Sequence, residues 1–345
     1  MPNKLEPLQL SVKAGGMPVV SVRIHHSQFP DHVRRDLLKS LRTRQVNHKF
    51  HYDSIKQAQQ WLALHESYSP ARTDPRCLEI YDKSFQFAAE KIGTQPVHLI
   101  GLGCGGGQKE GQLLELFAAR GTTVHFSASD VSPALVIVAQ QRAAQIIGAE
   151  HCDALVCDLQ TADDLPEVLN DLSVTGARRI ITFFGLIPNF EPQTILGKLC
   201  AIMRPNDFLL FSANLAPGPD YHAGVERILP LYRNELTRDW LMTFLRDLGV
   251  EERDGQVTFE IEEIARLKRI TASFQFSRER QLRVDDETFR FEPGETIRLF
   301  FSYRHTPATI RALLQEQGIQ VAEQWIAPSE EEGVFFCRKT TVSGK

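Results

Sequence analysis

The stretch that decides the fold reads VHLIGLGCGGG and covers residues 97–107. Its first part, 97–102, is a mostly apolar run typical of a buried strand. Glycines then crowd the turn, and residues 108–120 have the periodicity of an amphipathic helix. Glycine lets a backbone approach a ligand closely, and the first turn of a helix offers main-chain N–H groups without partners. We therefore predict a ligand-binding loop at the end of the first strand of a sheet.

Two aspartates stand at the ends of the next two predicted strands. Asp130 follows the strand 124–129, and Asp158 follows the strand 154–157. A carboxylate in the first position can accept hydrogen bonds from both ribose hydroxyls of a nucleoside. A carboxylate in the second can accept from an adenine amino group. The loop and both carboxylates therefore predict a nucleoside-containing ligand.

Three interpretations compete for this constellation. It is a structural turn with two helix-capping aspartates, a nicotinamide-dinucleotide site, or a site for S-adenosylmethionine (SAM). Gly101, Gly103 and Gly106 satisfy the spacing of a dinucleotide fingerprint. Asp158, two closing strands near the C-terminus and the lack of an obvious hydride-transfer partner favour SAM as the cofactor.

The chain around the loop alternates between strands and helices. Further strands are predicted at 179–184 and 207–213, with helices at 134–147, 165–172 and 193–203. This alternation predicts a parallel sheet with helices on both faces. A later helix at 307–316 and two strands at 319–325 and 333–339 predict an antiparallel closing strand, which an ordinary NAD-binding sheet lacks.

The alternation is interrupted between residues 216 and 302, where a helical stretch precedes several strands. We predict an α/β fold: a Rossmann-like SAM-dependent methyltransferase domain with a mixed sheet and an inserted α+β substrate-binding domain. The SAM-binding domain is predicted at 75–215 and 303–345, and the substrate-binding domain at 15–74 and 216–302. Residues 1–20 are predicted to be partly extended or loose.

Composition narrows the classes of function. The 345 residues carry a formal net charge of −4 and no long basic run, which argues against a nucleic-acid partner. The six cysteines lack zinc-site spacing, so we predict reduced thiols and no metal site. The sequence has neither a basic-then-apolar leader nor a run of roughly 20 apolar residues, so we predict a cytoplasmic protein without a membrane partner.

Short motifs along the chain agree in order with one family. GCGGGQK at 103–109, followed by DVS at 130–132, resembles the histidine-specific methyltransferases, which N-methylate the amine of histidine. The other matching segments are FHYD at 50–53, YSPARTD at 68–74, FGLIPN at 184–189, and IR at 297–298 leading to Ser302. The resemblance spans nearly the whole chain and implies a SAM domain with an inserted substrate domain.

The resemblance also implies roles for single residues. The implied cofactor contacts lie in the loop and at the strand ends: Gly101, Gly103, Gly105, Lys109, Asp130, Asp158 and Leu159. Tyr52 and Asn189, as catalytic residues, and Tyr68 are implied to hold the carboxylate and amine of an amino acid. The rest of the implied substrate pocket consists of Gly185, Ala272, Phe300 and Ser302. A tyrosine hydroxyl and an asparagine carbonyl can orient an amine without adding a competing nucleophile.

One position departs from the family in a way that changes the expected substrate. Phe300 stands where histidine methylators carry a Glu that grips the imidazole, and Ala272 replaces a Met. Losing a charge-assisted hydrogen bond costs roughly 1.5–3 kcal/mol, so histidine should bind about tenfold worse or more. We predict N-methylation of a small-molecule amine, an amino acid or derivative other than histidine, with an aromatic or apolar side chain.

Alternative functions remain open at this point: a histidine Nα-methyltransferase, or a pseudo-methyltransferase that serves as an interaction module. A nucleic-acid methyltransferase is disfavoured, because IPNF at 187–190 has the Pro and Asn in the wrong order for the adenine-methylating tetrad.

Three further polar residues, His51, Arg304 and His305, stand close in the sequence to residues of the predicted site. We predict that His51 is structural, on the other face of an extended segment from Tyr52. Arg304 and His305 could serve an anionic substrate group, but we expect them to cap the next helix or face water.

Overall fold

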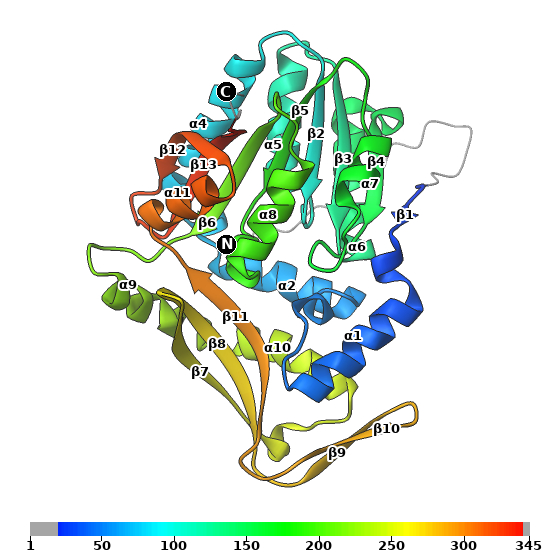
Figure 1. The fold of residues 1–345 in the computed structure, drawn as a ribbon, viewed down its shortest axis with the longest axis vertical. Coiled ribbons are helices and arrows are strands. Elements are labelled where there is room, and N and C mark those ends of the chain that lie inside the picture. The colour runs from blue at the N-terminus through cyan, green and yellow to red at the C-terminus, as the bar shows by residue number, and fades with distance from the viewer. Residues whose placement is uncertain (1–19, 341–345) are drawn as a thin grey trace, which may run out of the picture.

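The computed structural model describes residues 20–340, and a large mixed sheet forms its centre (Figure 1). The eight strands lie in the order β1-β4-β3-β2-β5-β6-β13-β12. Their bounds are β1 Arg23–Ile24, β2 Val97–Leu102, β3 Val124–Asp130, β4 Cys152–Val156, β5 Arg178–Phe183, β6 Phe208–Asn214, β12 Ile319–Ile326 and β13 Glu332–Lys339.

Strand direction in this sheet changes near one edge. All pairs from β1 to β6 are parallel, whereas β13 runs antiparallel to β6 and β12 antiparallel to β13. This arrangement confirms the predicted Rossmann-like methyltransferase fold with its antiparallel closing strand. Because β2 to β6 are parallel, their carboxyl ends, and the loops that follow them, lie at one edge of the sheet.

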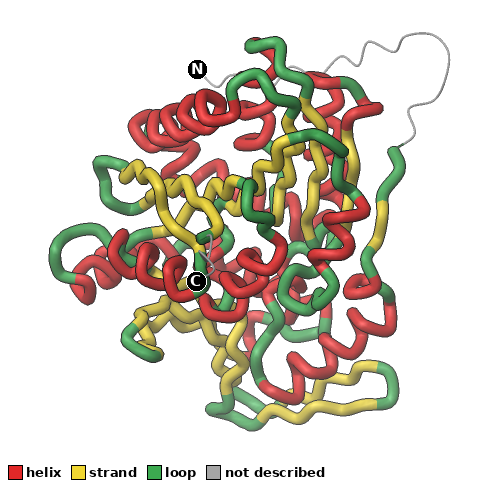
Figure 2. The backbone as a smooth tube through the Cα atoms, turned by 45° about the horizontal axis from the view of Figure 1, so that its top comes forward, coloured by secondary structure: helices red, strands yellow, loops and turns green. Residues whose placement is uncertain are grey.

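Helices cover both faces of the large sheet (Figure 2). Along β2, Leu99 packs with the helices on one face and Ile100 with those on the other, as expected from the two-residue period of a strand. The first group is α4 Pro75–Ile92, α5 Gln108–Ala119 and α6 Pro133–Ile147. The second group is α7 Leu165–Asp171, α8 Pro192–Ile202 and α11 Pro307–Glu316.

A smaller three-stranded sheet lies below the large one (Figure 1). It is antiparallel, in the order β11-β8-β7, and a separate hairpin extends from it. The bounds are β7 Gly255–Ile264, β8 Leu267–Phe276, β9 Arg280–Val284, β10 Glu287–Phe291 and β11 Thr296–Arg304. One apolar cluster joins this sheet to helices from distant parts of the sequence, α1 Pro30–Thr43, α2 Ile55–Tyr68 and α10 Glu235–Asp247.

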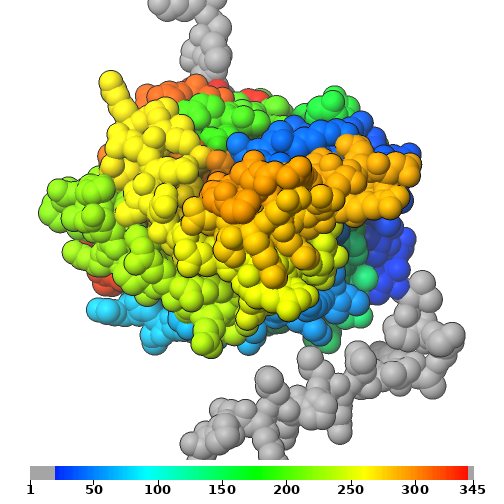
Figure 3. Space-filling model, turned by 90° about the horizontal axis from the view of Figure 1, so that it is seen from below, coloured from blue at the N-terminus to red at the C-terminus, as the bar shows by residue number. Residues whose placement is uncertain are grey.

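Short elements complete the connections between these parts. They are α3 Pro70–Thr73, α9 Tyr221–Ile228 and the 3-10 helices η1 His26–Gln28, η2 His48–His51, η3 Ala149–His151, η4 Ile187–Asn189, η5 Leu229–Tyr232 and η6 Glu252–Asp254. Seen from below, the hairpin lies beside α1 (Figure 3). Arg34 Nε donates to Asp285 at 2.5 Å and Arg42 Nη2 donates to Glu287 at 2.6 Å, so ion pairs hold the two together.

The start of the described chain differs from expectation. Residues 15–74 were predicted to belong to the substrate domain, but β1 pairs with β4 at the edge of the large sheet. Two residues carry too little hydrophobic periodicity to reveal such a pairing. The predicted loose segment at 1–20 lies outside the described residues except for its last position.

Two further sequence predictions concern the whole chain. All six cysteines are free thiols, as expected from their scattered positions. Within residues 20–340, no helix combines the length and apolar character that a bilayer crossing requires.

Candidate active site

The glycine loop after β2 is held closed by Asp130. The main-chain N–H groups of Gly105 and Ser132 donate to the two carboxylate oxygens of Asp130, each at 2.9 Å. Burial raises the pKa of Asp130, while these N–H donors act in the opposite direction. At Gly103 the φ angle is +58°, which favours glycine, and a Cβ would lie 2.3 Å from a methyl carbon of Leu186, which would have to move. The hydrogen bonds to Asp130 and this conformation together define the shape of the loop.

Asp158, at the end of β4, presents a buried oxygen to the same side of the sheet. Its Oδ1 accepts from Gln160 N at 2.9 Å, while its Oδ2 is buried without a hydrogen bond. The Nζ of Lys49 lies 3.4 Å from that Oδ2, and both side chains are 2% exposed. Lys49 Nζ donates instead to Asp36 at 2.5 Å. Lys49 could not be predicted for this site, because Asp158 is more than a hundred residues away in the sequence.

A buried chain of hydrogen bonds supports the Asp158 backbone. The N–H of Asp158 donates to Ser27 Oγ at 3.0 Å, and that hydroxyl lies 2.8 Å from His25 Nδ1. His25 Nε2 lies 2.8 Å from Asp164. His25, His26 and Asp164 each have a possible metal-ligand atom, and these three atoms lie within 4.8 Å of one another. Both nitrogens of His25 already have protein partners, so the arrangement serves to position the loop that carries Asp158.

A second buried cluster lies at the start of α5. Lys109 Nζ donates to the Tyr81 hydroxyl at 2.6 Å and lies 3.6 Å from Glu332. The Tyr81 hydroxyl donates to Glu332, and burial raises the pKa of Tyr81 well above its ordinary value. Lys109 was predicted as a cofactor contact, whereas Tyr81 and Glu332 were missed. Tyr81 follows the ordinary apolar pattern of α4, and Glu332 only begins a strand, so neither gave a signal.

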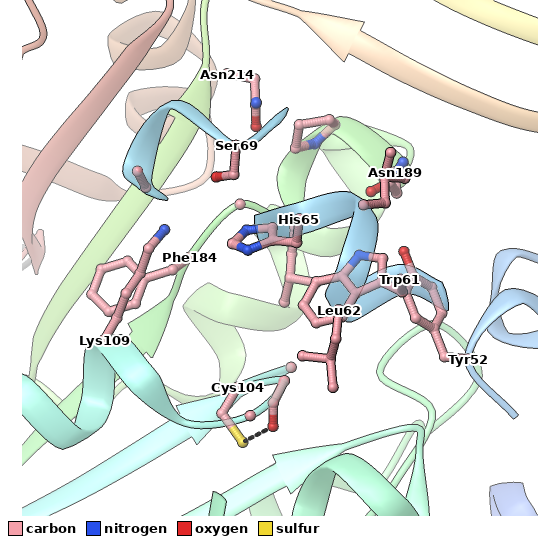
Figure 4. A pocket seen from close by; sticks show the side chains of 18 of the residues that line it. Tyr52, Trp61, Leu62, His65, Ser69, Cys104, Lys109, Phe184, Asn189 and Asn214 are labelled. Atoms are coloured by element: carbon pink, nitrogen blue, oxygen red, sulfur yellow. Dashed lines mark hydrogen bonds between the residues drawn. The ribbon is translucent and has the colours of Figure 1, made fainter. Parts of the chain in front are cut away.

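A cavity of about 360 Å³ connects these groups with the small sheet. This volume lies in the range of small-molecule sites. In Figure 4, Lys109 and Phe184 lie at one end of the view and Tyr52 and Asn189 at the other, with His65 and Trp61 of α2 between them. His65 stacks on Trp61 with ring centroids 5.0 Å apart, and burial lowers its pKa to about 3. The imidazole in the middle of the cavity is therefore neutral at physiological pH.

Most of the residues predicted for the site line this cavity. They are Gly103, Gly105, Lys109, Asp130, Asp158 and Leu159 on the cofactor side, and Tyr52, Tyr68, Gly185, Asn189, Phe300 and Ser302 on the substrate side. The two exceptions are buried elsewhere. Gly101 lies inside β2, where a Cβ would press on Cys104, and Ala272 lies opposite Phe300 in the β8–β11 pair with no exposed surface. Ala272 is therefore a buried neighbour of Phe300 and does not line the cavity.

Asn189 links the large sheet to the small one. It ends η4 after β5, and its Nδ2 donates to the main-chain oxygen of Phe301 on β11 at 2.8 Å. This bond leaves the Oδ1 atom of Asn189 as an acceptor. Tyr52 follows η2 and packs edge-to-face on Trp61 with centroids 5.8 Å apart, and burial raises its pKa. Tyr68 ends α2 and is 46% exposed, so it stands at the rim.

The far wall of the cavity is aromatic. The Phe300 ring lies 6.1 Å from the Tyr232 ring and 5.7 Å from the Trp240 ring, centroid to centroid. Ser302, two residues further along β11, accepts a hydrogen bond from the Tyr232 hydroxyl at 2.8 Å. This part of the cavity therefore offers an apolar surface bordered by a hydroxyl.

The predictions for His51, Arg304 and His305 can be compared with the structure. The segment holding His51 is a 3-10 helix and not extended, yet His51 is fully buried, with its Nε2 2.7 Å from Leu299 O. The expectation that Arg304 and His305 cap the next helix or face water is wrong. Both are buried, and Thr306 caps α11. Arg304 lines the cavity, because it lies on the same face of β11 as Phe300 and Ser302.

Comparison with known proteins agrees with this geometry. A sequence model of the histidine-specific, SAM-dependent methyltransferases matches residues 33–339. The fold and the site thus define a SAM-dependent methyltransferase. More narrowly, the chain belongs to the histidine-specific methyltransferase family. A search of curated proteins finds no match.

Solved structures with a similar arrangement are distant in sequence. One is a SAM-dependent methyltransferase from Clostridium acetobutylicum ATCC 824, at 11% identity, with 82% of this chain and 99% of that chain covered and a TM-score of 0.44. A magnesium protoporphyrin IX methyltransferase from Synechocystis PCC 6803 with bound SAH has 11% identity, coverage of 84% and 96%, and a TM-score of 0.46. For the Burkholderia thailandensis 1,6-didemethyltoxoflavin-N1-methyltransferase the values are 13%, 82% and 91%, and 0.42.

The residues of the cavity fit SAM. The buried Oδ2 of Asp158 lacks a hydrogen bond and can accept one from an adenine amino group. Gly103 and Gly105 leave the loop without side chains where a ligand must approach closely. Lys109 and Glu332 offer one charge of each sign, which matches the carboxylate and amine of the methionine part. These groups can hold the methyl donor between the loop and α2.

Proposed function

We propose that this enzyme transfers a methyl group to the amine of a small molecule, an amino acid or derivative other than histidine, whose side chain is aromatic or apolar. The observation that supports the proposal is the wall formed by Phe300, Tyr232 and Trp240. An imidazole placed against Phe300 finds neither an acceptor nor an opposite charge there. A phenyl or indole ring, by contrast, packs favourably on such edges and faces.

When bound, SAM supplies an electrophilic methyl group on a sulfonium. The protein's part in an in-line displacement is to position the amine and to exclude water, which can supply much of the acceleration. We assign the positioning to the Oδ1 atom of Asn189 and to the hydroxyl of Tyr52. Because burial raises the pKa of Tyr52, its hydroxyl keeps its proton and orients the amine without acting as a base. A free amine with a pKa of about 8 is partly neutral at physiological pH, and this neutral fraction provides the lone pair that attacks the methyl group.

The same proposal assigns a role to each of the two domains. We assign cofactor binding to residues 75–215 and 303–345, and substrate binding to 15–74 and 216–302, except for β1, which pairs with β4 of the large sheet. Tyr68, at the rim, and Gly185, after β5, complete the substrate side of the cavity.

Two experiments test the proposal. Calorimetry with S-adenosylhomocysteine (SAH) should show binding by the wild type and none by Asp130→Ala, because that carboxylate closes the loop through Gly105 and Ser132. Asp171→Ala, at the exposed end of α7, is the control. Mass spectrometry of a cell extract incubated with the enzyme and SAM should then reveal an amine heavier by one or more methyl groups.

The outcomes separate the alternatives. Histidine as the preferred substrate identifies a histidine Nα-methyltransferase and contradicts the assignment of an aromatic or apolar side chain. SAH binding without turnover of any amine favours a pseudo-methyltransferase that serves as an interaction module. Tight NADH binding without SAH binding replaces both with an oxidoreductase.

A further inference from the structure

Arg304 is a buried cation without an acidic partner. Its side chain lines the cavity, and the residue is 7% exposed. Its Nη2 donates to the Tyr232 hydroxyl at 2.7 Å, while its Nε has no hydrogen-bond partner. Within the described part of the chain, no carboxylate oxygen lies within 4.0 Å of its guanidinium nitrogens. Burying a guanidinium without a counter-ion costs free energy. An anion bound beside Arg304 would offset that cost, so this part of the cavity favours an anionic group.

Two glutamates that line the cavity form no ion pair with Arg304. Glu331 and Glu332 both line the cavity. Glu332 already accepts from Tyr81 and lies near Lys109, and Glu331 forms no ion pair among residues 20–340. The charge of Arg304 is therefore available to a ligand that enters the cavity.

The hydrogen bonds around Arg304 leave the Ser302 hydroxyl as a second donor for a ligand. A guanidinium can only donate, so the Tyr232 oxygen accepts from Arg304 and the Tyr232 proton goes to Ser302 Oγ. Ser302 consequently keeps its own proton for another acceptor. Phe300, Ser302 and Arg304 stand at alternate positions on one face of β11, with Arg304 roughly 13 Å from Phe300 along the strand. Asn189 bonds to the main-chain oxygen of Phe301, which lies between Phe300 and Ser302 on this strand.

We propose that Arg304, with Ser302 beside it, binds a carboxylate of the substrate. The enzyme would then prefer an amine that carries a carboxylate over an amine that carries none. This inference rests on the proposed function. The carboxylate has two possible sources, the α-carboxylate of an amino acid or a second acidic group on its side chain. Both present the same planar pair of oxygens, which a guanidinium fork recognises well.

Four probes distinguish the two sources. They are phenethylamine, L-phenylalanine, para-carboxyphenethylamine and para-carboxy-L-phenylalanine, which carry no carboxylate, the α-carboxylate, the distal one and both. Binding of each to SAH-saturated protein is measured by calorimetry for the wild type, Arg304→Gln and Arg304→Lys. Arg298→Gln is the matched control, since Arg298 lies on the same strand and bonds to Gln45 outside the cavity.

We expect Arg304→Gln to weaken binding of every probe with the relevant carboxylate by about ten- to a hundredfold, with Arg304→Lys between it and the wild type. Phenethylamine and SAH should bind equally to all variants. The proposal is overturned if carboxylated probes bind Arg304→Gln as well as the wild type, or if no carboxylated probe binds the wild type at millimolar concentration.

The product found in the extract separates this inference from the function on which it rests. A methylated product with a carboxylate, formed slowly by Arg304→Gln, supports both. A methylated amine without any acidic group overturns the role of Arg304 and leaves the proposed function standing. The absence of any methylated product overturns the proposed function, and the carboxylate site falls with it.

Discussion

Asn189 of η4 donates its Nδ2 proton to the main-chain oxygen of Phe301, 2.8 Å away on β11. A loop at the carboxyl edge of the large sheet is thereby fixed to the strand that carries the aromatic wall. The same bond decides which end of the amide faces the cavity, because only the NH₂ group can meet a carbonyl. One hydrogen bond thus connects the loop after β5 to β11 and leaves the Oδ1 atom of Asn189 as an acceptor.

Replacing Asn189 by Ala should therefore impair catalysis more than cofactor binding. We expect kcat/KM for the amine to fall about a hundredfold, because a displaced reactant loses its alignment with the methyl group. SAH affinity, measured by calorimetry, should stay within error of the wild type. An equal loss of SAH affinity would instead show that Asn189 supports the cofactor loop.

Exchanging Phe300 for Glu should move specificity towards histidine. A carboxylate at this position on β11 can accept a hydrogen bond from an imidazole and pair with its charged form. We expect histidine binding to SAH-loaded protein to improve about tenfold or more, and binding of phenylalanine to weaken. Phe300→Leu, which keeps an apolar wall, is the control. Unchanged histidine affinity in a folded Phe300→Glu protein would contradict the placement of the substrate side chain against β11.

The cofactor side of the site could be predicted from the sequence because its signals are local. Gly103, Asp130 and Asp158 each stand directly at the end of a recognisable strand, so they could be selected as candidates without coordinates. The same holds for the alternation of elements that predicts the large sheet.

The supporting residues could not be predicted in this way, because they meet only through the tertiary fold. Lys49 approaches Asp158 across more than a hundred residues of chain, and Tyr81 approaches Glu332 across a longer separation still. Arg304 was misjudged for a related reason. An arginine before a helix usually faces water, whereas Arg304 is buried because it ends β11 on the face that lines the cavity.

The buried ion pair of Lys49 with Asp36 and Asp158 should matter for stability and for the cofactor. Lys49→Met removes the cation that donates to Asp36 and lies 3.4 Å from the carboxylate of Asp158, a side chain that is 2% exposed. We expect the free energy of unfolding to fall by about 3–5 kcal/mol, as for other broken buried pairs. Urea denaturation measures this change. Lys39→Met, an exposed lysine on α1, should have little effect, and a similar loss in both variants would contradict a specific role for the pair.

The buried, neutral His51 predicts how stability depends on pH. Burial lowers its pKa to about 4 from an ordinary 6.5, although its bond to Leu299 O opposes the shift. Between these two values the unfolded chain binds a proton at this position and the native protein does not. Stability therefore rises with pH across this window, and the contribution of His51 is lost as the pH falls below 6.5. The slope from one such group is roughly 1.4 kcal/mol per pH unit.

His51→Gln retains a donor for Leu299 O but cannot titrate. Its free energy of unfolding, measured by urea denaturation from pH 7 down to about 4.5, should fall less steeply than that of the wild type by up to that slope. Other buried histidines, His98 and His305, have pKa values lowered by burial to about 3, so part of the dependence should persist. His222→Gln, which replaces an exposed side chain of α9, should follow the wild-type curve. Identical slopes for His51→Gln and the wild type would mean that His51 gains a proton in the native state as readily as in the unfolded chain.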